Sequence, residues 1–82
     1  TLVGRGTADA EAFDMLGRAQ LALGRPREAA EAFRQADAMA PGNAGLLSRL
    51  AAARLAVGDV AGMAEAANAA LRADPDGPAA RM

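Results

Sequence analysis

The same set of large, small and helix-breaking residues occurs twice in this 82-residue chain, 34 positions apart. The matched residues are Gly24 and Gly58, Pro41 and Pro75, Leu16 and Leu50, and Ala36 and Ala70. A fixed period of this length indicates stacked repeats, in which each unit buries its hydrophobic face against its neighbour. Because such a stack does not close on itself, it exposes a long surface that is available for binding.

Within each unit, hydrophobic residues recur at helical spacing and no segment alternates like a strand, so we expect an all-α fold. The predicted helices cover residues 10–23, 26 to the turn at 41–43, 44–57 and 60–73. Gly24 is expected to end the first helix and Pro26 to begin the second. Asn43 and Asp59 are the expected N-caps of the third and fourth helices.

The repeats leave short segments at both ends of the chain. The expected organisation is a lead-in over 1–9, repeats over 10–43 and 44–77, and a truncated capping or third-repeat segment over 78–82. Thr7 or Asp9 is expected to cap the first helix, and Pro78 can begin a fifth. Since the chain starts abruptly at Thr1 without methionine, we expect an excised piece or a processed product. We also expect the chain to be a module of a larger protein.

Alanine dominates the composition, with 25 of the 82 residues, whereas only 2% are aromatic. Alanine is the best helix former but buries little area, so the core is expected to be thin. Gly62 is an exception inside the predicted fourth helix, where it costs about 1 kcal/mol relative to alanine. We attribute it to a close helix contact or to simple tolerance of the glycine, not to a function. The bias towards alanine, arginine and glycine is typical of a GC-rich bacterial genome, and the compartment stays open between cytoplasm and periplasm.

The residue types present exclude several function classes. A net charge of −1 without aromatic interleaving argues against nucleic-acid binding. The chain has no histidine and no cysteine, so no catalytic pair of the Ser–His or Cys–His type can form within it. Its carboxylates fall on helix faces that we expect to be solvated, which predicts no metal or cofactor site. No stretch is long and apolar enough to span a membrane. We therefore expect a non-catalytic chain.

Two helices per 34 residues with this pattern resemble the tetratricopeptide repeat. With Ala10 as the first position, the family's bulky, small and turn positions fall on the following residues: Phe13, Leu16, Gly17, Gly24, Ala29, Phe33, Ala36 and Pro41. The second copy, from Ala44, keeps Leu47, Leu50, Ala51, Gly58, Ala70 and Pro75. The copies depart from the family at Gln20, Arg54, Met63 and Ala67. The small residues are expected to let the helices approach, and Phe13, Leu16 and Phe33 to fill the gaps between them.

The resemblance implies two stacked antiparallel helical hairpins, a fragment of a right-handed superhelix. It also implies that the first helix of each repeat lines a concave groove that binds a peptide or partner protein. The groove positions would be Glu11, Asp14, Arg18 and Leu21 in the first repeat and Gly45, Ser48, Arg49, Ala52 and Leu55 in the second. The Lys and Asn of the family's carboxylate clamp are absent, because Asp14 and Arg18 occupy the clamp positions of the first repeat.

Arg18 and Arg49 are the expected anchors, since guanidinium groups pair with carboxylates through two parallel hydrogen bonds. Asp14 is expected either to orient one of these arginines or to repel an acidic ligand. The plainer alternative is that these charges only solvate a helix face.

The fourth helix carries a second candidate surface, a flank formed by Met63, Ala64, Ala67 and Leu71. Two repeats are fewer than the three or so that stability usually requires, so we expect a further repeat or a second chain to cover it. The predicted function is a protein-binding scaffold. The alternatives are a self-association element, as a two-fold dimer or by helix exchange, and an accessory segment of an enzyme whose catalytic domain lies elsewhere.

Overall fold

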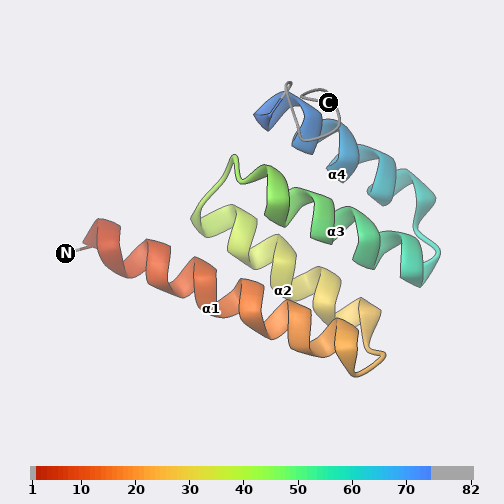
Figure 1. Ribbon diagram of the computed structural model, residues 1–82, viewed down its shortest axis with the longest axis horizontal. Coiled ribbons are helices and arrows are strands. Elements are labelled where there is room, and N and C mark those ends of the chain that lie inside the picture. Colours follow the sequence, from red (N-terminus) through yellow and green to blue (C-terminus); the bar gives the residue numbers. More distant parts are fainter. Residues whose placement is uncertain (1, 75–82) are drawn as a thin grey trace, which may run out of the picture.

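The computed structural model describes the backbone of residues 2–74 and the side chains of residues 8–74. Four helices follow one another: α1 (Leu2–Ala22), α2 (Pro26–Met39), α3 (Ala44–Val57) and α4 (Val60–Ala73). They lie side by side in chain order, and each runs antiparallel to the one before it (Figure 1). The chain thus forms two stacked helical hairpins, as the repeat predicts. None of the described helices is long and apolar enough to cross a membrane.

The first helix begins earlier than the sequence indicates. The expected start at Ala10, with Thr7 or Asp9 as cap, is wrong, because α1 extends from Leu2 through both residues. Lengthening an existing helix adds one hydrogen bond per residue and needs no new nucleus, which offsets the cost of the glycines at 4 and 6. The predicted break at 75–78 and the segment 78–82 lie outside the described residues.

The expected caps of the third and fourth helices are confirmed. The Asn43 side chain accepts a hydrogen bond from the Leu46 N–H at 3.1 Å and so caps α3. Asp59 caps α4 in the same way, by accepting from the Gly62 N–H at 2.9 Å. Between the paired helices, Gly24 (φ 76°) and Gly58 (φ 93°) adopt the left-handed conformation that glycine tolerates.

The tightest helix contact lies inside the first repeat, where the Phe33 ring of α2 packs on the backbone of α1 at Gly17. Phe33 is fully buried. A Cβ added at Gly17 would lie 2.6 Å from Cε1 of the ring and 2.7 Å from Cδ1. The ring therefore occupies the space that any larger residue at position 17 needs. At the equivalent positions the second repeat has Ala51 in place of the glycine and Ala67 in place of the phenylalanine. The space between its two helices is therefore filled by two small side chains and not by a ring against bare backbone.

The core continues without a break across the boundary between the repeats. Leu46, Leu47 and Leu50 of α3 are at most 6% exposed. They belong to the same buried cluster as Ala29, Phe33 and Ala36 of α2. The α2–α3 contact therefore joins the two hairpins into one hydrophobic unit.

Leu16 does not fill the interior as expected. It is 46% exposed, whereas its counterpart in the second repeat, Leu50, is 4% exposed. The reason lies in the neighbours of each helix: α3 packs against both α2 and α4, while α1 packs extensively only against α2 in the described part of the chain. Phe13 is half-buried against the core, so of the three predicted gap-fillers only Phe33 is fully enclosed.

Replacing Gly17 by alanine should destabilise the protein, because the added methyl overlaps the Phe33 ring. Overpacking of this kind costs about 1–3 kcal/mol, which exceeds the gain of about 1 kcal/mol in helix propensity. Urea denaturation should therefore show a lower unfolding free energy for Gly17→Ala.

Two further variants decide whether the ring is responsible. In a Phe33→Leu background, Gly17→Ala should cost much less or become stabilising. Gly45→Ala is the matched control, since a Cβ there meets nothing closer than 3.4 Å. An equal loss from Gly17→Ala in both backgrounds would contradict the proposed contact.

Candidate binding face on the first helix of each repeat

The nine predicted groove positions all lie on α1 and α3, the first helix of each repeat, and we call them the groove face. Six are exposed in the structure: Glu11, Arg18, Gly45, Ser48, Ala52 and Leu55. Asp14 and Arg49 are half-buried, and so is Leu21, which packs against the core cluster. Leu21 thus contributes mainly to packing, whereas the other eight positions are at least partly accessible to a ligand.

An ion pair connects the two helices of this face. Asp14 of α1 accepts two hydrogen bonds from Arg49 of α3, from Nε to Oδ1 and from Nη2 to Oδ2, both at 2.9 Å. Its Oδ2 also accepts from Nη2 of Arg18, one turn further along α1, at 2.6 Å. The Asp14 side chain is only 13% exposed, so water competes weakly for these bonds. The structure thus brings together three of the predicted residues, and Asp14 orients both arginines.

The pKa of Asp14 reflects these contacts. Partial burial acts to raise it, but the hydrogen bonds and positive charges of Arg18 and Arg49 outweigh burial and hold the pKa below its usual value. The same contact raises the pKa of Arg18, chiefly through the hydrogen bond to Asp14. Asp14 therefore stays ionised at neutral pH and keeps the two arginines in place.

The arginines retain unused donors. Arg49 commits Nε and Nη2 to Asp14, and Arg18 commits Nη2, while each guanidinium carries five N–H groups. Two arginines around one aspartate leave one positive charge in excess within this cluster, while Glu11, one turn earlier on α1, brings the net charge of the whole groove face to zero. The Arg18 side chain is 56% exposed and presents this charge towards solvent.

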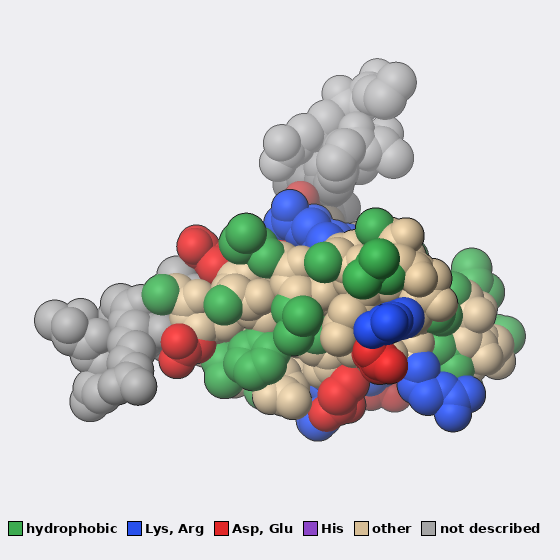
Figure 2. Space-filling model, turned by 90° about the horizontal axis from the view of Figure 1, so that it is seen from below, with side chains coloured by type: hydrophobic (Ala, Val, Ile, Leu, Met, Phe, Trp, Pro, Cys, Tyr) green, Lys and Arg blue, Asp and Glu red, His purple; other side chains and the backbone are tan. Residues whose placement is uncertain are grey.

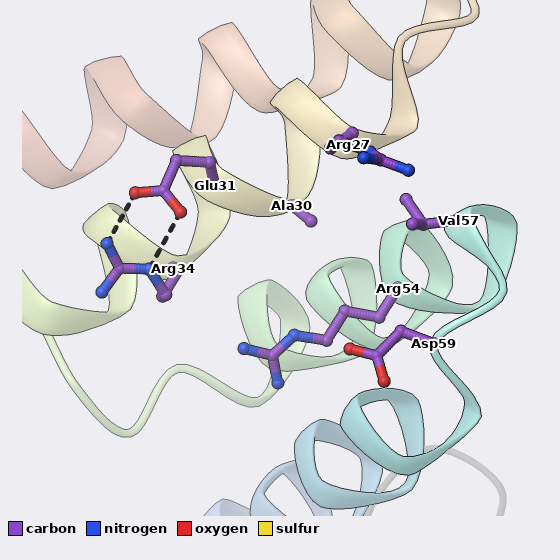
Figure 3. A pocket seen from close by; sticks show the side chains of 7 residues that line it. All are labelled: Arg27, Ala30, Glu31, Arg34, Arg54, Val57 and Asp59. Atoms are coloured by element: carbon purple, nitrogen blue, oxygen red, sulfur yellow. Dashed lines mark hydrogen bonds and ion pairs between the residues drawn. The ribbon is translucent and has the colours of Figure 1, made fainter.

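A hollow, which the sequence did not reveal, lies along the seam between α2 and α3 (Figure 3). We call it the seam site. It has a volume of about 190 Å³ and is lined by Arg27, Ala30, Glu31, Arg34, Arg54, Val57 and Asp59. One signal was present in the sequence: Arg27 and Arg34 are seven residues apart, which places them on one face of a helix. Nothing in the sequence indicated which α3 residues would lie opposite them.

Among the residues with described side chains, no group of three or more acidic residues could hold a metal ion. Gly62 has a physical explanation. A Cβ at this position would overlap the Asp59 carboxylate and lie 2.9 Å from Cδ of Arg54. Arg54 crosses this point to donate from Nη1 to the Gly62 carbonyl at 3.1 Å. The tightest contact at Gly62 is therefore with Asp59, the cap of its own helix, and the contact with Arg54 of α3 comes second.

A family model described as tetratricopeptide repeat matches residues 20–82, which is more than half of the chain. The matched region begins near the end of α1 and includes α2, α3 and α4. No curated protein matches the chain.

The Asp14 contacts predict a pH dependence of stability. Because folding lowers the pKa of Asp14, its contribution to stability is present above the unfolded value near 3.8 and is lost as the pH falls through the lower folded value. Unfolding free energies measured by urea denaturation between pH 7 and pH 2 should therefore fall less steeply in the acid range for Asp14→Asn than for the wild type.

Two arginine variants separate the contributions of the partners. Between pH 7 and pH 2 the unfolding free energy should fall less for Arg49→Gln than for Arg18→Gln. The reason is that Arg49 makes two hydrogen bonds to Asp14 and is less exposed than Arg18. Exposed pairs four residues apart on a helix contribute little to stability, because water and salt screen them. Identical acid profiles for wild type and Asp14→Asn would show that the bridge does not stabilise the fold.

Proposed function

The chain belongs to the tetratricopeptide repeat family, whose repeats are generally protein–protein interaction modules, and from this we propose that its groove face binds a peptide or partner protein. The family is typically a non-catalytic scaffold, and we propose the same role for this chain. The observation that carries the proposal is the Asp14–Arg49 bridge, which fixes residues of both repeats in one continuous face.

The face offers both charge and apolar surface to a ligand. Arg18 is exposed and has unused donors, so an acidic side chain or a C-terminal carboxylate can pair with it. Leu55, further along α3, is 55% exposed and offers an apolar contact. On α3, Ser48 and Ala52 are small and exposed, which leaves room for a peptide backbone. We propose a ligand that combines an acidic group with an apolar side chain.

A random peptide library provides a test that can be carried out without the natural partner. Peptides selected from it on the wild-type chain should be enriched in acidic residues. Their binding should weaken about tenfold or more with Arg18→Glu, because a favourable charged contact of about 1.4 kcal/mol or more is replaced by repulsion.

Two variants make this test specific. Ala52→Trp should block the face by bulk while Asp14, Arg18 and Arg49 are all kept. Arg72→Glu makes the same charge change in the last turn of α4 and should leave binding unchanged. The groove face would be refuted if Arg18→Glu and Ala52→Trp both bound the selected peptides as the wild type does.

Self-association is the second candidate function, and the repeat itself supports it. At the α2–α3 boundary, Leu46, Leu50 and Ala53 are buried. Their counterparts on α1 are Ala12, Leu16 and Ala19, all of which are exposed. Figure 2 views the molecule from the α1 side and shows hydrophobic side chains spread over this face.

In α4, Ala64 and Leu71 of the predicted flank are exposed, while Met63 and Ala67 are half-buried against the core. We propose that α1 of one copy can pack on α4 of another as α3 packs on α2.

This contact joins two different surfaces, so each copy that is added still has one of them free. The chains therefore assemble into longer oligomers instead of closing as a two-fold dimer. Sedimentation should then show mass rising with concentration. Leu71→Asp should reduce the association, because Leu71 is 63% exposed and its counterpart in the first repeat is Asp37. Leu55→Asp, an equal loss of apolar surface on the groove face, is the control. A wild-type chain that stays monomeric at high concentration would eliminate this function.

A further inference from the structure

The charges of the groove face follow a fixed order along α1. Glu11, Asp14 and Arg18 lie on one side of this helix, because they are three and four residues apart, and Glu11 and Arg18 are exposed. At 3.6 residues per turn, Glu11 and Arg18 leave the helix only about 20° apart, and they lie about 10.5 Å apart along its axis. The face therefore carries a negative charge near its N-terminal end and a positive charge two turns later.

Asp14 lies between these charges and does not alter their order, because its own charge is matched within the face. It accepts hydrogen bonds from Nε and Nη2 of Arg49 and is largely shielded from solvent. With Asp14 and Arg49 counted as one neutral pair, Arg18 keeps its positive charge although it also donates to Asp14. Glu11 makes no ion pair with another side chain that the structure describes. A ligand on this face thus meets the charges of Glu11 and Arg18.

An apolar contact lies beyond the positive end. α3 runs in the same direction as α1, because each helix is antiparallel to the one before it (Figure 1). The Asp14–Arg49 bridge places the two helices side by side at this point. Arg18 lies four residues beyond the bridge on α1, and Leu55, which is 55% exposed, lies six residues beyond it on α3. The order along the face is therefore negative, neutral, positive and apolar.

From this order we propose that the groove face selects an extended segment of a partner protein that carries a basic, an acidic and an apolar residue in sequence. The basic residue pairs with Glu11, the acidic residue pairs with Arg18, and the apolar residue contacts Leu55. This inference rests on the proposed function, because it assigns the ligand of the same face. A peptide in the polyproline II conformation places every third side chain on one side, about 9 Å apart. A basic residue three positions from an acidic one therefore spans the distance between Glu11 and Arg18.

The apolar residue makes the order of the charges matter. A segment without it can turn end to end and satisfy both charges with its chain running in either direction. A segment with the apolar residue but with exchanged charges has two choices: it places each charge beside a like charge, or it gives up the contact with Leu55. Repulsion of a wrong ligand contributes to specificity as much as attraction of the right one. Glu11 is therefore a specificity residue of the groove face.

Two peptides of identical composition test the order. They are Lys-Ala-Ala-Glu-Ala-Leu and Glu-Ala-Ala-Lys-Ala-Leu, with acetylated and amidated ends that remove the terminal charges. Binding is measured from the backbone amide signals of the protein in nuclear magnetic resonance titrations at low salt, where exposed charges are least screened. The first peptide should bind the wild type about fivefold more tightly, because its isomer loses two favourable charge contacts that are each modest.

Reversing the two charges of the protein should reverse this preference. Glu11→Arg combined with Arg18→Glu keeps the net charge of the face, and this variant should bind the second peptide more tightly than the first. Glu65→Arg combined with Arg72→Glu is the matched control. These two residues are exposed on α4 and are also seven positions apart, so the control should keep the wild-type preference.

A third peptide, Gln-Ala-Ala-Glu-Ala-Leu, separates this inference from the proposed function. It lacks the basic residue, so it should bind the wild type more weakly than the lysine peptide, and Glu11→Gln should remove that difference. The inference is wrong, although the groove face still binds, if the two isomers bind equally or if the preference survives the charge reversal. It is also wrong if the glutamine peptide binds as well as the lysine peptide. If none of the three peptides shifts the signals of the groove face, the proposed function fails and the inference fails with it.

Discussion

The contact of the Phe33 ring with the bare backbone at Gly17 is the interaction on which the rest of the structure depends. A chain so rich in alanine buries little area per residue, and Phe33 is its one large side chain with no exposed surface among those described. Truncating a buried phenylalanine typically costs about 3–5 kcal/mol. Because a small domain has a total stability of only about 5–15 kcal/mol, this one residue accounts for much of it.

The packing of the first hairpin determines where the second hairpin lies and which surfaces are available. Phe33 and Ala36 present the buried side of α2 to Leu46, Leu47 and Leu50 of the next repeat. With α3 placed in this way, Arg49 can reach Asp14, and the seam between α2 and α3 forms on another side of the same helix. The groove face and the seam site therefore both depend on the α2–α3 boundary, and each draws its residues from both repeats.

The sequence predicted most of the fold because the information was local. Asn43, Asp59 and Gly58 each act within a few residues, and the helix ends they specify are confirmed. The start of α1 could not be predicted in this way, since a possible cap at Asp9 competes with simple extension of the helix. Leu16 and Leu50 occupy the same repeat position but differ in exposure, because burial depends on which helix lies opposite. The same limit applies to the sites: Arg18 and Arg49 were identified from the repeat register, whereas the seam arginines required the positions of two helices.

Hydrogen exchange of the backbone amides most directly tests whether the α2–α3 boundary holds the two repeats together as one unit. Amides in the middle of α2 and α3 should be protected to the same extent and exchange only when the whole chain unfolds. Those in the first turns of α1 and the last turn of α4 should exchange earlier, through local opening. Two separate levels of protection, one for α1 with α2 and another for α3 with α4, would show that the hairpins unfold independently and would contradict this account.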